Sequence, residues 1–226
     1  MITIILVSII LGIGAGIAII GIVELKNQGK RKYKAKDINY EGERLVDRTI
    51  RLYFGRNYHL INNITLPKSD NGSTQIDHIL ISEYGIFVIE TKHYSGRIYG
   101  SENDYQWTQA FNKVQKYRFL NPIKQNASHI KQLSQLLYDV PIDSLISIVV
   151  FTGKGEIKTE VGKNVLYLKD LANHIEKHNK KIISLNQIHN TIGKIEYHRK
   201  EECEKTDKEH IEYVKKMTTN CQRHSN

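Results

Sequence analysis

The pattern of apolar and polar positions divides the chain into three parts. Residues 2–23 are apolar or small and carry no charged side chain. In residues 37–199, short apolar runs alternate with polar turns, as expected of a domain that buries a core. Residues 200–226 are mixed in charge and poor in apolar side chains, which predicts a solvated helix or a frayed tail.

The spacing of apolar residues predicts the elements of the middle part. Apolar positions three and four residues apart predict helices, and short alternating or continuous apolar runs predict strands. The predicted helices are residues 40–53, 121–138, 169–177 and 184–197, and the predicted strands are residues 58–66, 74–82, 86–92, 96–100, 105–108, 145–152 and 165–168. This order predicts an α/β or α+β domain with a mixed sheet flanked by helices. We expect the core domain at residues 37–155, with the strand and helices of residues 156–199 packing on it.

Two features of the predicted strands indicate how they are arranged in the sheet. Only residues 83–85 link the strands 74–82 and 86–92, and such a short link favours an antiparallel hairpin. The run 145–152 is almost entirely apolar, which is typical of a buried central strand.

Three charged residues interrupt or end these apolar strands. Asp77 lies within the strand 74–82, and Glu90 and Lys92 lie at the end of the strand 86–92. Side chains alternate between the two faces of a strand, so Glu90 and Lys92 share a face. Two carboxylates and a lysine are the groups needed to hold a divalent metal ion and to orient a water beside it.

These residue types suit hydrolysis of a phosphodiester with Mg²⁺ or Mn²⁺ as the cofactor. Asp77 and Glu90 would supply carboxylate ligands, and the backbone carbonyl of Thr91 would add a third ligand. A lysine beside two metal-bound carboxylates keeps its proton, so Lys92 would orient water or stabilise charge rather than act as a free base. Glu43, near the start of the first predicted helix, is either a third acid of the site or an acid favoured there by the helix dipole.

The alternative for Asp77, Glu90 and Lys92 is an ion pair on an exposed face of the sheet, which contributes only about 0–1 kcal/mol. A strand that faces solvent on one side alternates apolar and polar residues more clearly than Phe87–Ile89 do before Glu90. The pattern therefore favours a functional site.

For other residues near these strands, the sequence gives weaker indications of a functional role. His78 points to the strand face opposite Asp77 and is predicted to pack in the core, whereas His93 could contact a phosphate. Nearby aromatic side chains could stack on bases or pack in the sheet, and nearby cations could face a phosphate or only water. The aromatic residues are Tyr94, Tyr99, Tyr105 and Trp107, and the cations are Lys113, Lys116, Arg118, Lys124 and Lys131.

The apolar segment at residues 2–23 is predicted to be an uncleaved membrane anchor. Its 22 residues would form a helix of about 33 Å, enough to cross the core of a bilayer. A cleaved signal peptide would need a basic residue before a shorter apolar run. Gly12 and Gly16 have the spacing of a helix-dimer contact, which allows a homodimer, or they reflect only the small residues of this segment.

The basic linker at residues 24–36 orients this anchor. Because positive residues stay on the cytoplasmic side, we expect a single-pass protein of the cell membrane, with its N-terminus outside and the domain in the cytoplasm. The net charge is +9, but six of the positive residues lie between Lys26 and Lys36, which leaves 27 positive and 24 negative side chains and a balance of +3. The high charge therefore reflects topology and anionic lipid more than a basic nucleic-acid groove. Cys203 and Cys221 lack metal-like spacing and are expected to be free thiols.

Several short blocks of sequence surround the three charged residues of the strands. They are Gly42-Glu43, Thr74–His78, Gly85–Lys92, Gly96, Trp107 and Asn121–Asn126. Together these blocks resemble the nuclease-related domain, NERD, which is similar to the PD-(D/E)xK restriction-endonuclease-like superfamily. The resemblance runs from about Tyr40 to Phe151, and the blocks that contain Asp77 and Glu90 are its most specific part.

The resemblance implies a restriction-endonuclease-like α/β core, a mixed sheet flanked by helices. The positions that match are Glu43, Asp77, Glu90 and Lys92 for metal binding and catalysis, and Gln75 and Gln125 as side chains that line the site. Ile76 stands where the superfamily motif is named for proline.

Two functions follow from these observations. The first is a membrane-anchored, Mg²⁺-dependent nuclease that cuts nucleic acid, with DNA favoured, at the cytoplasmic face. The second is a non-catalytic module that binds nucleic acid or another partner at the inner face of the membrane. The tether and the slight balance of +3 outside the basic linker motivate this second function.

Overall fold

A computed structural model of the chain describes residues 40–68, 72–201 and 203–223. The chain divides into two compact units, Met1–Glu41 and Gly42–Asn226, and the elements described below belong to the second unit apart from the first residues of the first helix.

The predicted membrane anchor, residues 2–23, and the basic linker, residues 24–36, lie outside the described residues. Among the helices that are described, none is both long enough and apolar enough to cross a membrane. The anchor, and the orientation deduced from it, therefore remain predictions.

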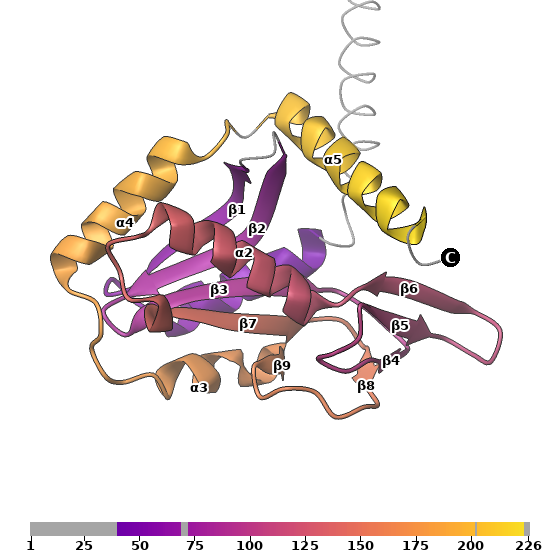
Figure 1. Cartoon of the computed structure of the whole chain (residues 1–226). Coiled ribbons are helices and arrows are strands. Elements are labelled where there is room, and N and C mark those ends of the chain that lie inside the picture. Colours follow the sequence, from indigo (N-terminus) through magenta and orange to yellow (C-terminus); the bar gives the residue numbers. More distant parts are fainter. Residues whose placement is uncertain (1–39, 69–71, 202, 224–226) are drawn as a thin grey trace, which may run out of the picture. The chain divides into compact units, whose positions relative to one another are not determined.

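The larger of two sheets has five strands in the order β1-β2-β3-β7-β9 (Figure 1). The strands are β1 (His59–Pro67), β2 (Ser73–Ser82), β3 (Gly85–Lys92), β7 (Leu145–Phe151) and β9 (Val165–Tyr167). β2 pairs antiparallel with both β1 and β3, whereas β7 pairs parallel with β3 and β9. The sheet is therefore mixed, as the sequence predicts, and the apolar strand β7 lies inside it.

The predicted hairpin between β2 and β3 is confirmed. Ser82 faces Gly85 in the register, and the turn residue Gly85 has a φ of +146°. Only glycine adopts this backbone conformation readily. A Cβ at this position would also lie 2.6 Å from Cδ1 of Ile146, so the turn needs glycine both for its conformation and for space.

A smaller sheet has four strands in the order β6-β5-β4-β8. They are β4 (Arg97–Tyr99), β5 (Gln106–Ala110), β6 (Lys116–Leu120) and β8 (Glu156–Ile157). The sequence predicts β4 and β5 but not β6, whose first three residues are exposed and show no clear apolar pattern. β6 exists because it pairs with β5, where Phe119 faces Trp107, and this tertiary contact is absent from the local pattern.

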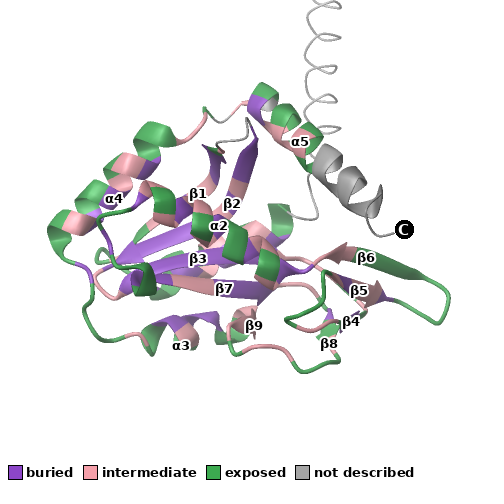
Figure 2. Cartoon of the chain, in the orientation of Figure 1, coloured by how far each residue is buried: buried purple, intermediate pink, exposed green. Residues whose placement is uncertain are grey.

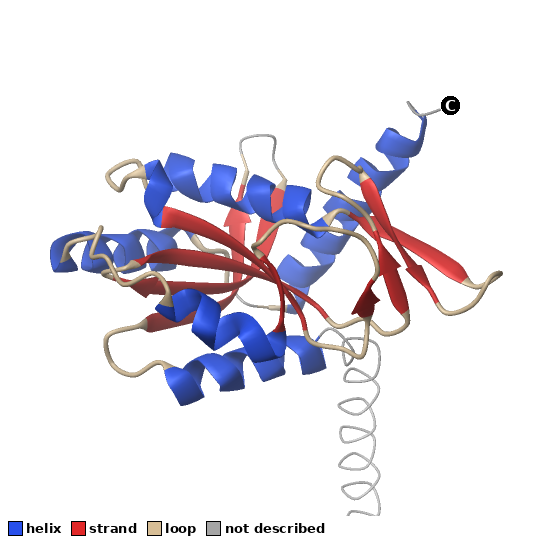
Figure 3. Ribbon diagram, turned by 90° about the horizontal axis from the view of Figure 1, so that it is seen from below, coloured by secondary structure: helices blue, strands red, loops and turns tan. Residues whose placement is uncertain are grey.

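Helices cover both faces of the larger sheet, so the predicted α/β class with a mixed sheet flanked by helices is confirmed (Figure 3). After the first helix, residues 40–53, the helices are α2 (Pro122–Leu136), α3 (Leu171–Glu176), α4 (Leu185–His198) and α5 (Glu204–Arg223). Short 3₁₀ turns, Ile142–Ser144 and Leu168–Asp170, precede β7 and α3. Of the two predictions for the polar end of the chain, a helix or a frayed tail, the described residues Glu204–Arg223 form the helix, α5.

The core has one layer on each face of the larger sheet, and Figure 2 shows β2, β3 and β7 buried between them. On one face, Leu133 of α2 and Ile195 of α4 belong to the same cluster of buried side chains as Ile79 and Val88. On the other face, the first helix and α3 pack on strand residues such as Phe87. The two layers hold β2 and β3 rigidly, which fixes the side chains at the ends of these strands.

Asn121 and Pro122 start α2 in the way that the sequence predicts. The side-chain oxygen of Asn121 accepts a hydrogen bond from the backbone N–H of Ile123 at 3.0 Å, and Pro122 occupies the first turn. The amide nitrogen of Asn121 also donates to the carbonyl oxygen of Asp104 at 2.7 Å. This hydrogen bond fixes the start of α2 against the loop between β4 and β5 of the smaller sheet. The next turn of α2 then lies beside β3.

Candidate functional site

Asp77 lies where both neighbours of β2 depart from regular pairing. The ladder between β2 and β3 ends at His78 and Ile89, and on the other side Asn63 of β1 has a left-handed φ of 52°. Oδ2 of Asp77 instead accepts a hydrogen bond from the backbone N–H of Thr91 at 2.7 Å. The carboxylate thus takes the place of a ladder bond and holds the two strands together at the site.

Glu90 is buried, with only 1% of its surface exposed. Its Oε1 accepts a hydrogen bond from Nζ of Lys92 at 2.5 Å, and its Oε2 lies 3.1 Å from Nε2 of His129. Burial by itself would raise the pKa of Glu90, but Lys92 and His129 lower that pKa to about 2. The burial of Glu90 rules out the alternative of an exposed surface ion pair.

The pKa of Asp77 is shifted in the opposite direction. Burial, and then the negative charges of Glu90 and Glu43, raise the pKa of Asp77 well above its usual range. The charge of Lys92 and the hydrogen bond from Thr91 oppose this shift without cancelling it. Glu43, Asp77 and Glu90 therefore form one group of mutually repelling carboxyl groups, referred to below as the acid cluster.

Lys92 lies between the acid cluster and α2. Besides Glu90, its Nζ donates a hydrogen bond to Oε1 of Gln125 at 3.1 Å. Burial would lower the pKa of Lys92, but the charges of Glu90, Tyr94 and Asp77 raise it far above its usual value. Lys92 is therefore a fixed positive charge at neutral pH, which fits a charge-stabilising role better than that of a base.

Sequence reasoning missed His129, which is buried in α2. Its Nδ1 lies 2.7 Å from Oγ1 of Thr74, and its Nε2 contacts Glu90. The available signal was its spacing, because His129 follows Gln125 by four residues and so lies on the same face of the helix. Without a structure, nothing showed that this face of α2 covers the end of β3.

The remaining predicted site residues separate into two groups. Gln75 and Gln125 line one cavity beside the acid cluster, together with His129. His93 is not among the described residues that line this cavity. Its Nδ1 lies 3.0 Å from Oγ1 of Thr152, at the end of β7. A Cβ added to Gly42 of the first helix would lie 2.7 Å from Cβ of His93, so the structure associates the two glutamines with the cavity and His93 with the packing of the first helix.

The structure also shows which of the other candidate residues are buried and which are exposed. His78 is buried and its Nδ1 lies 3.0 Å from Oδ1 of Asn62, so it packs in the core as predicted. Trp107 is fully buried and is a core residue, whereas Tyr105 is 54% exposed. The five predicted cations Lys113, Lys116, Arg118, Lys124 and Lys131 are all exposed.

The donor types of the acid cluster fit a hard divalent cation. Asp77 and Glu90 offer carboxylate oxygens, the carbonyl of Thr91 adjoins them, and a cation would relieve the repulsion that raises the pKa of Asp77. However, within the described part of the chain no three His, Cys, Asp or Glu residues are close enough to enclose a metal ion. Both oxygens of Glu90 already have partners, so one of these contacts, such as that of Oε1 with Lys92, would have to open for metal binding.

Comparison with known proteins gives the family. Residues 38–152, about half of the chain, match the nuclease-related domain, NERD. An uncharacterized protein of Bacillus anthracis is 38% identical over 157 residues, which cover 67% of this chain and 72% of that protein. The chain therefore belongs to the NERD family.

One solved structure has a weaker similarity. The 5-hydroxymethylcytosine-specific restriction enzyme AbaSI matches with 13% identity and a TM-score of 0.24, over 77% of this chain and 46% of the enzyme. A similarity at this level adds nothing to the argument from the family and the site.

Proposed function

We propose that this protein is a membrane-anchored, Mg²⁺-dependent phosphodiesterase that acts on nucleic acid, with DNA favoured, at the cytoplasmic face of the membrane. The observation that carries the proposal is the buried pairing of Glu90 with Lys92 beside Asp77. Burying charged groups is costly, and carboxyl groups with strongly shifted pKa values gather at functional sites. Membership of a nuclease-related family supports the same chemistry.

Each residue has a defined part in this reaction. Asp77, Glu90 and the carbonyl of Thr91 would hold Mg²⁺ or Mn²⁺, which supplies Lewis-acid polarisation of the phosphate and a more acidic water. Lys92 carries a positive charge that can stabilise the additional negative charge of the phosphate in the transition state. Glu43 completes the acid cluster from the first helix, and His129 and Gln125 keep Glu90 and Lys92 in position.

A non-catalytic function is the second candidate, and a specific observation favours it. Both oxygens of Glu90 have hydrogen-bond partners, one of which is the positive charge of Lys92. A lysine can satisfy a buried carboxylate without any metal ion. In this case the domain would bind nucleic acid or a protein partner at the membrane surface, and the acid cluster would have only a structural role.

The membrane anchor and the homodimer belong to this proposal as predictions from the sequence. The anchor would hold the domain at the membrane, where the basic linker meets anionic lipid. Gly12 and Gly16 would allow two anchors to pack together. A fusion reporter at each end of the chain would test the predicted orientation.

A cleavage panel tests the enzymatic function. The full-length chain, purified in detergent, is incubated with single- and double-stranded DNA and RNA in the presence of Mg²⁺ or Mn²⁺. Asp77→Asn keeps an acceptor for the N–H of Thr91 but removes the charge, and we expect a loss of at least about 100-fold. Asp143→Asn, which changes an exposed acid, is the matched control and should cleave like the wild type.

Two outcomes decide between the candidates. Equal background cleavage by the wild type and by Asp77→Asn would reject the nuclease. Calorimetry that detects no uptake of Mg²⁺ or Mn²⁺ by the folded protein would favour the non-catalytic module.

A further inference from the structure

A cavity of about 380 Å³ lies beside the acid cluster. Residues of β2, of the loop before β5, of α2 and of α5 line it. This volume is in the usual range for sites that bind small molecules, about 300–1,000 Å³. It is far too small for a duplex, but it suits one nucleotide.

The ionisable side chains that line the cavity are basic or phenolic. The cations, imidazoles and phenol rings around the cavity are Lys68, Lys124, His129, His210, Tyr105 and Tyr213. Among the described residues that line it, none is an Asp or a Glu. The surroundings lower the pKa of His210, first through burial and then through the positive charges of His129 and Lys68. His210 is therefore neutral near pH 7, and the positive charge comes from Lys68 and Lys124. With these lysines and the rings of Tyr105 and Tyr213 in its lining, the cavity is suited to an anion that also carries an aromatic ring.

α5 supplies one wall of this cavity through specific contacts. Nδ1 of His210 lies 2.9 Å from Oγ of Ser73, and Nζ of Lys68 lies 5.5 Å from the centre of the Tyr213 ring. These contacts attach α5 to the ends of β1 and β2. α5 lies outside residues 38–152, which match the NERD domain, so part of this wall comes from a later segment of the chain.

Single side chains separate the cavity from Lys92 and Glu90 of the predicted catalytic site. Gln125 and His129 line the cavity, and the same two residues contact Lys92 and Glu90. A nucleotide held in the cavity would therefore lie beside the two residues that contact Lys92 and Glu90.

We propose that this cavity binds a single nucleotide, with its base against a tyrosine ring and its phosphate among the lysines. This inference rests on the proposed function, because it makes the cavity the substrate subsite of the acid cluster. The ligand is either the terminal nucleotide of a strand or a free nucleotide, since both have the same phosphate and base. Stacking of a base on an aromatic ring and a phosphate–lysine contact are the chemistry that recognises it.

Calorimetry with the full-length protein in EDTA, without divalent cations, tests this site. The probes are thymidine 5′-monophosphate, thymidine, inorganic phosphate and a short single-stranded DNA with a 5′-phosphate. We expect the monophosphate to bind at least about tenfold more tightly than thymidine or phosphate alone, because it makes both kinds of contact. The monophosphate should also raise the Tm of the wild-type protein, which is a readout that needs no variant.

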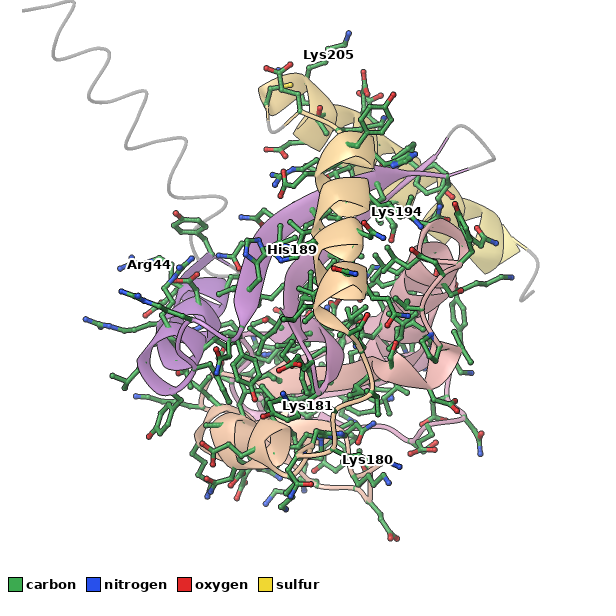
Figure 4. The ribbon with its side chains drawn as sticks, turned by 90° about the vertical axis from the view of Figure 1, so that its left-hand side faces the viewer. Arg44, Lys180, Lys181, His189, Lys194 and Lys205 are labelled. Carbon is green, nitrogen blue, oxygen red and sulfur yellow. The ribbon has the colours of Figure 1, made fainter. Side chains whose placement is uncertain are left out.

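Variants with matched controls locate the binding. Tyr213→Ala and Lys68→Ala should each weaken binding of the monophosphate by about tenfold, whereas Tyr213→Phe keeps the ring and should bind like the wild type. The controls are Tyr197→Ala, which removes a ring that is 84% exposed on α4, and Lys180→Ala. Figure 4 shows Lys180 in the segment after α3, away from α5, and neither control should change binding.

The outcomes separate this inference from the proposed function. No binding of the monophosphate, or equal binding by Tyr213→Ala, Lys68→Ala and the wild type, would reject the nucleotide site even if the protein cleaves DNA. Binding without cleavage would reject the nuclease and leave the site in place. Tighter binding of the phosphorylated strand assigns the cavity to a strand end, and tighter binding of the monophosphate assigns it to a free nucleotide.

Discussion

Nε2 of His129 lies 3.1 Å from Oε2 of Glu90, and this contact joins α2 to the acid at the end of β3. The other ring nitrogen of His129 lies 2.7 Å from Oγ1 of Thr74 in β2. The imidazole is thus held at both ends, and it holds one oxygen of Glu90 while Lys92 holds the other. Glu90 has one orientation as a result, which is what a metal ligand or a structural acid requires.

Replacement of His129 tests this positioning role. His129→Ala removes a partner from the buried carboxylate, and we expect a loss of about 1–3 kcal/mol in the free energy of unfolding and a weaker affinity for Mg²⁺. His129→Gln keeps a donor near Glu90 and should restore part of the Mg²⁺ affinity. Urea unfolding and calorimetry measure the two quantities. If His129→Ala loses stability while its Mg²⁺ affinity is unchanged, His129 has only a structural role.

Replacement of Lys92 should separate metal binding from catalysis. Lys92→Met removes the ammonium group that bonds to Oε1 of Glu90 and would release that oxygen for a cation. We expect Mg²⁺ affinity to stay the same or to rise, while cleavage falls by about 10²–10³-fold because charge stabilisation is lost. Calorimetry and a cleavage assay on the same preparation measure both. A parallel loss of affinity and cleavage would contradict this separation. Lys180→Met, an exposed change between α3 and α4, is the control.

Gly42→Ala tests how tightly the first helix packs beside the acid cluster. An added Cβ would lie 2.7 Å from Cβ of His93 and 2.7 Å from Oγ1 of Thr152. We expect a loss of about 1–3 kcal/mol in stability from overpacking, and lower activity because the helix that carries Glu43 must shift. Gly193→Ala in α4 is a matched control, since no atom lies within 4 Å of its added Cβ. That change should stabilise the protein by up to about 1 kcal/mol, as alanine favours helices. Thermal unfolding of both variants checks that Gly42→Ala lowers the stability and that Gly193→Ala raises it.

Asp47 should make stability depend on pH in the acid range. Burial would raise the pKa of Asp47, but hydrogen bonds from Arg51 at 3.0 Å and from Asn62 at 2.6 Å lower it below its ordinary value. A carboxylate with a lower pKa in the folded state stabilises that state above the ordinary pKa, and the stabilisation is lost as the pH falls through the folded pKa. Asp47→Asn should therefore destabilise the protein by about 0.2–1 kcal/mol at pH 7, because Asp47 is only partly buried, and by less near pH 3. Urea unfolding at the two pH values measures this, and an equal loss at both would contradict it.

Much of the fold was predictable because it depends on local patterns. The hairpin of β2 and β3 follows from apolar runs with a three-residue link, and the start of α2 follows from Asn121 and Pro122. β6 was not predictable, because its exposed residues form a strand only through pairing with β5.

The site divides in the same way. By itself, the sequence determined the types and order of the charged residues: Asp77, Glu90 and Lys92 interrupt or end strands that are otherwise apolar, and this pattern is visible without any contact. Only the tertiary structure decided that Glu90 bonds to His129, that Gln125 faces Lys92, and that α5 closes a cavity beside them. The reason is physical. Alternation and helix period act between neighbours in the chain, whereas these contacts join residues far apart in sequence, whose meeting depends on how the helices pack on the sheet.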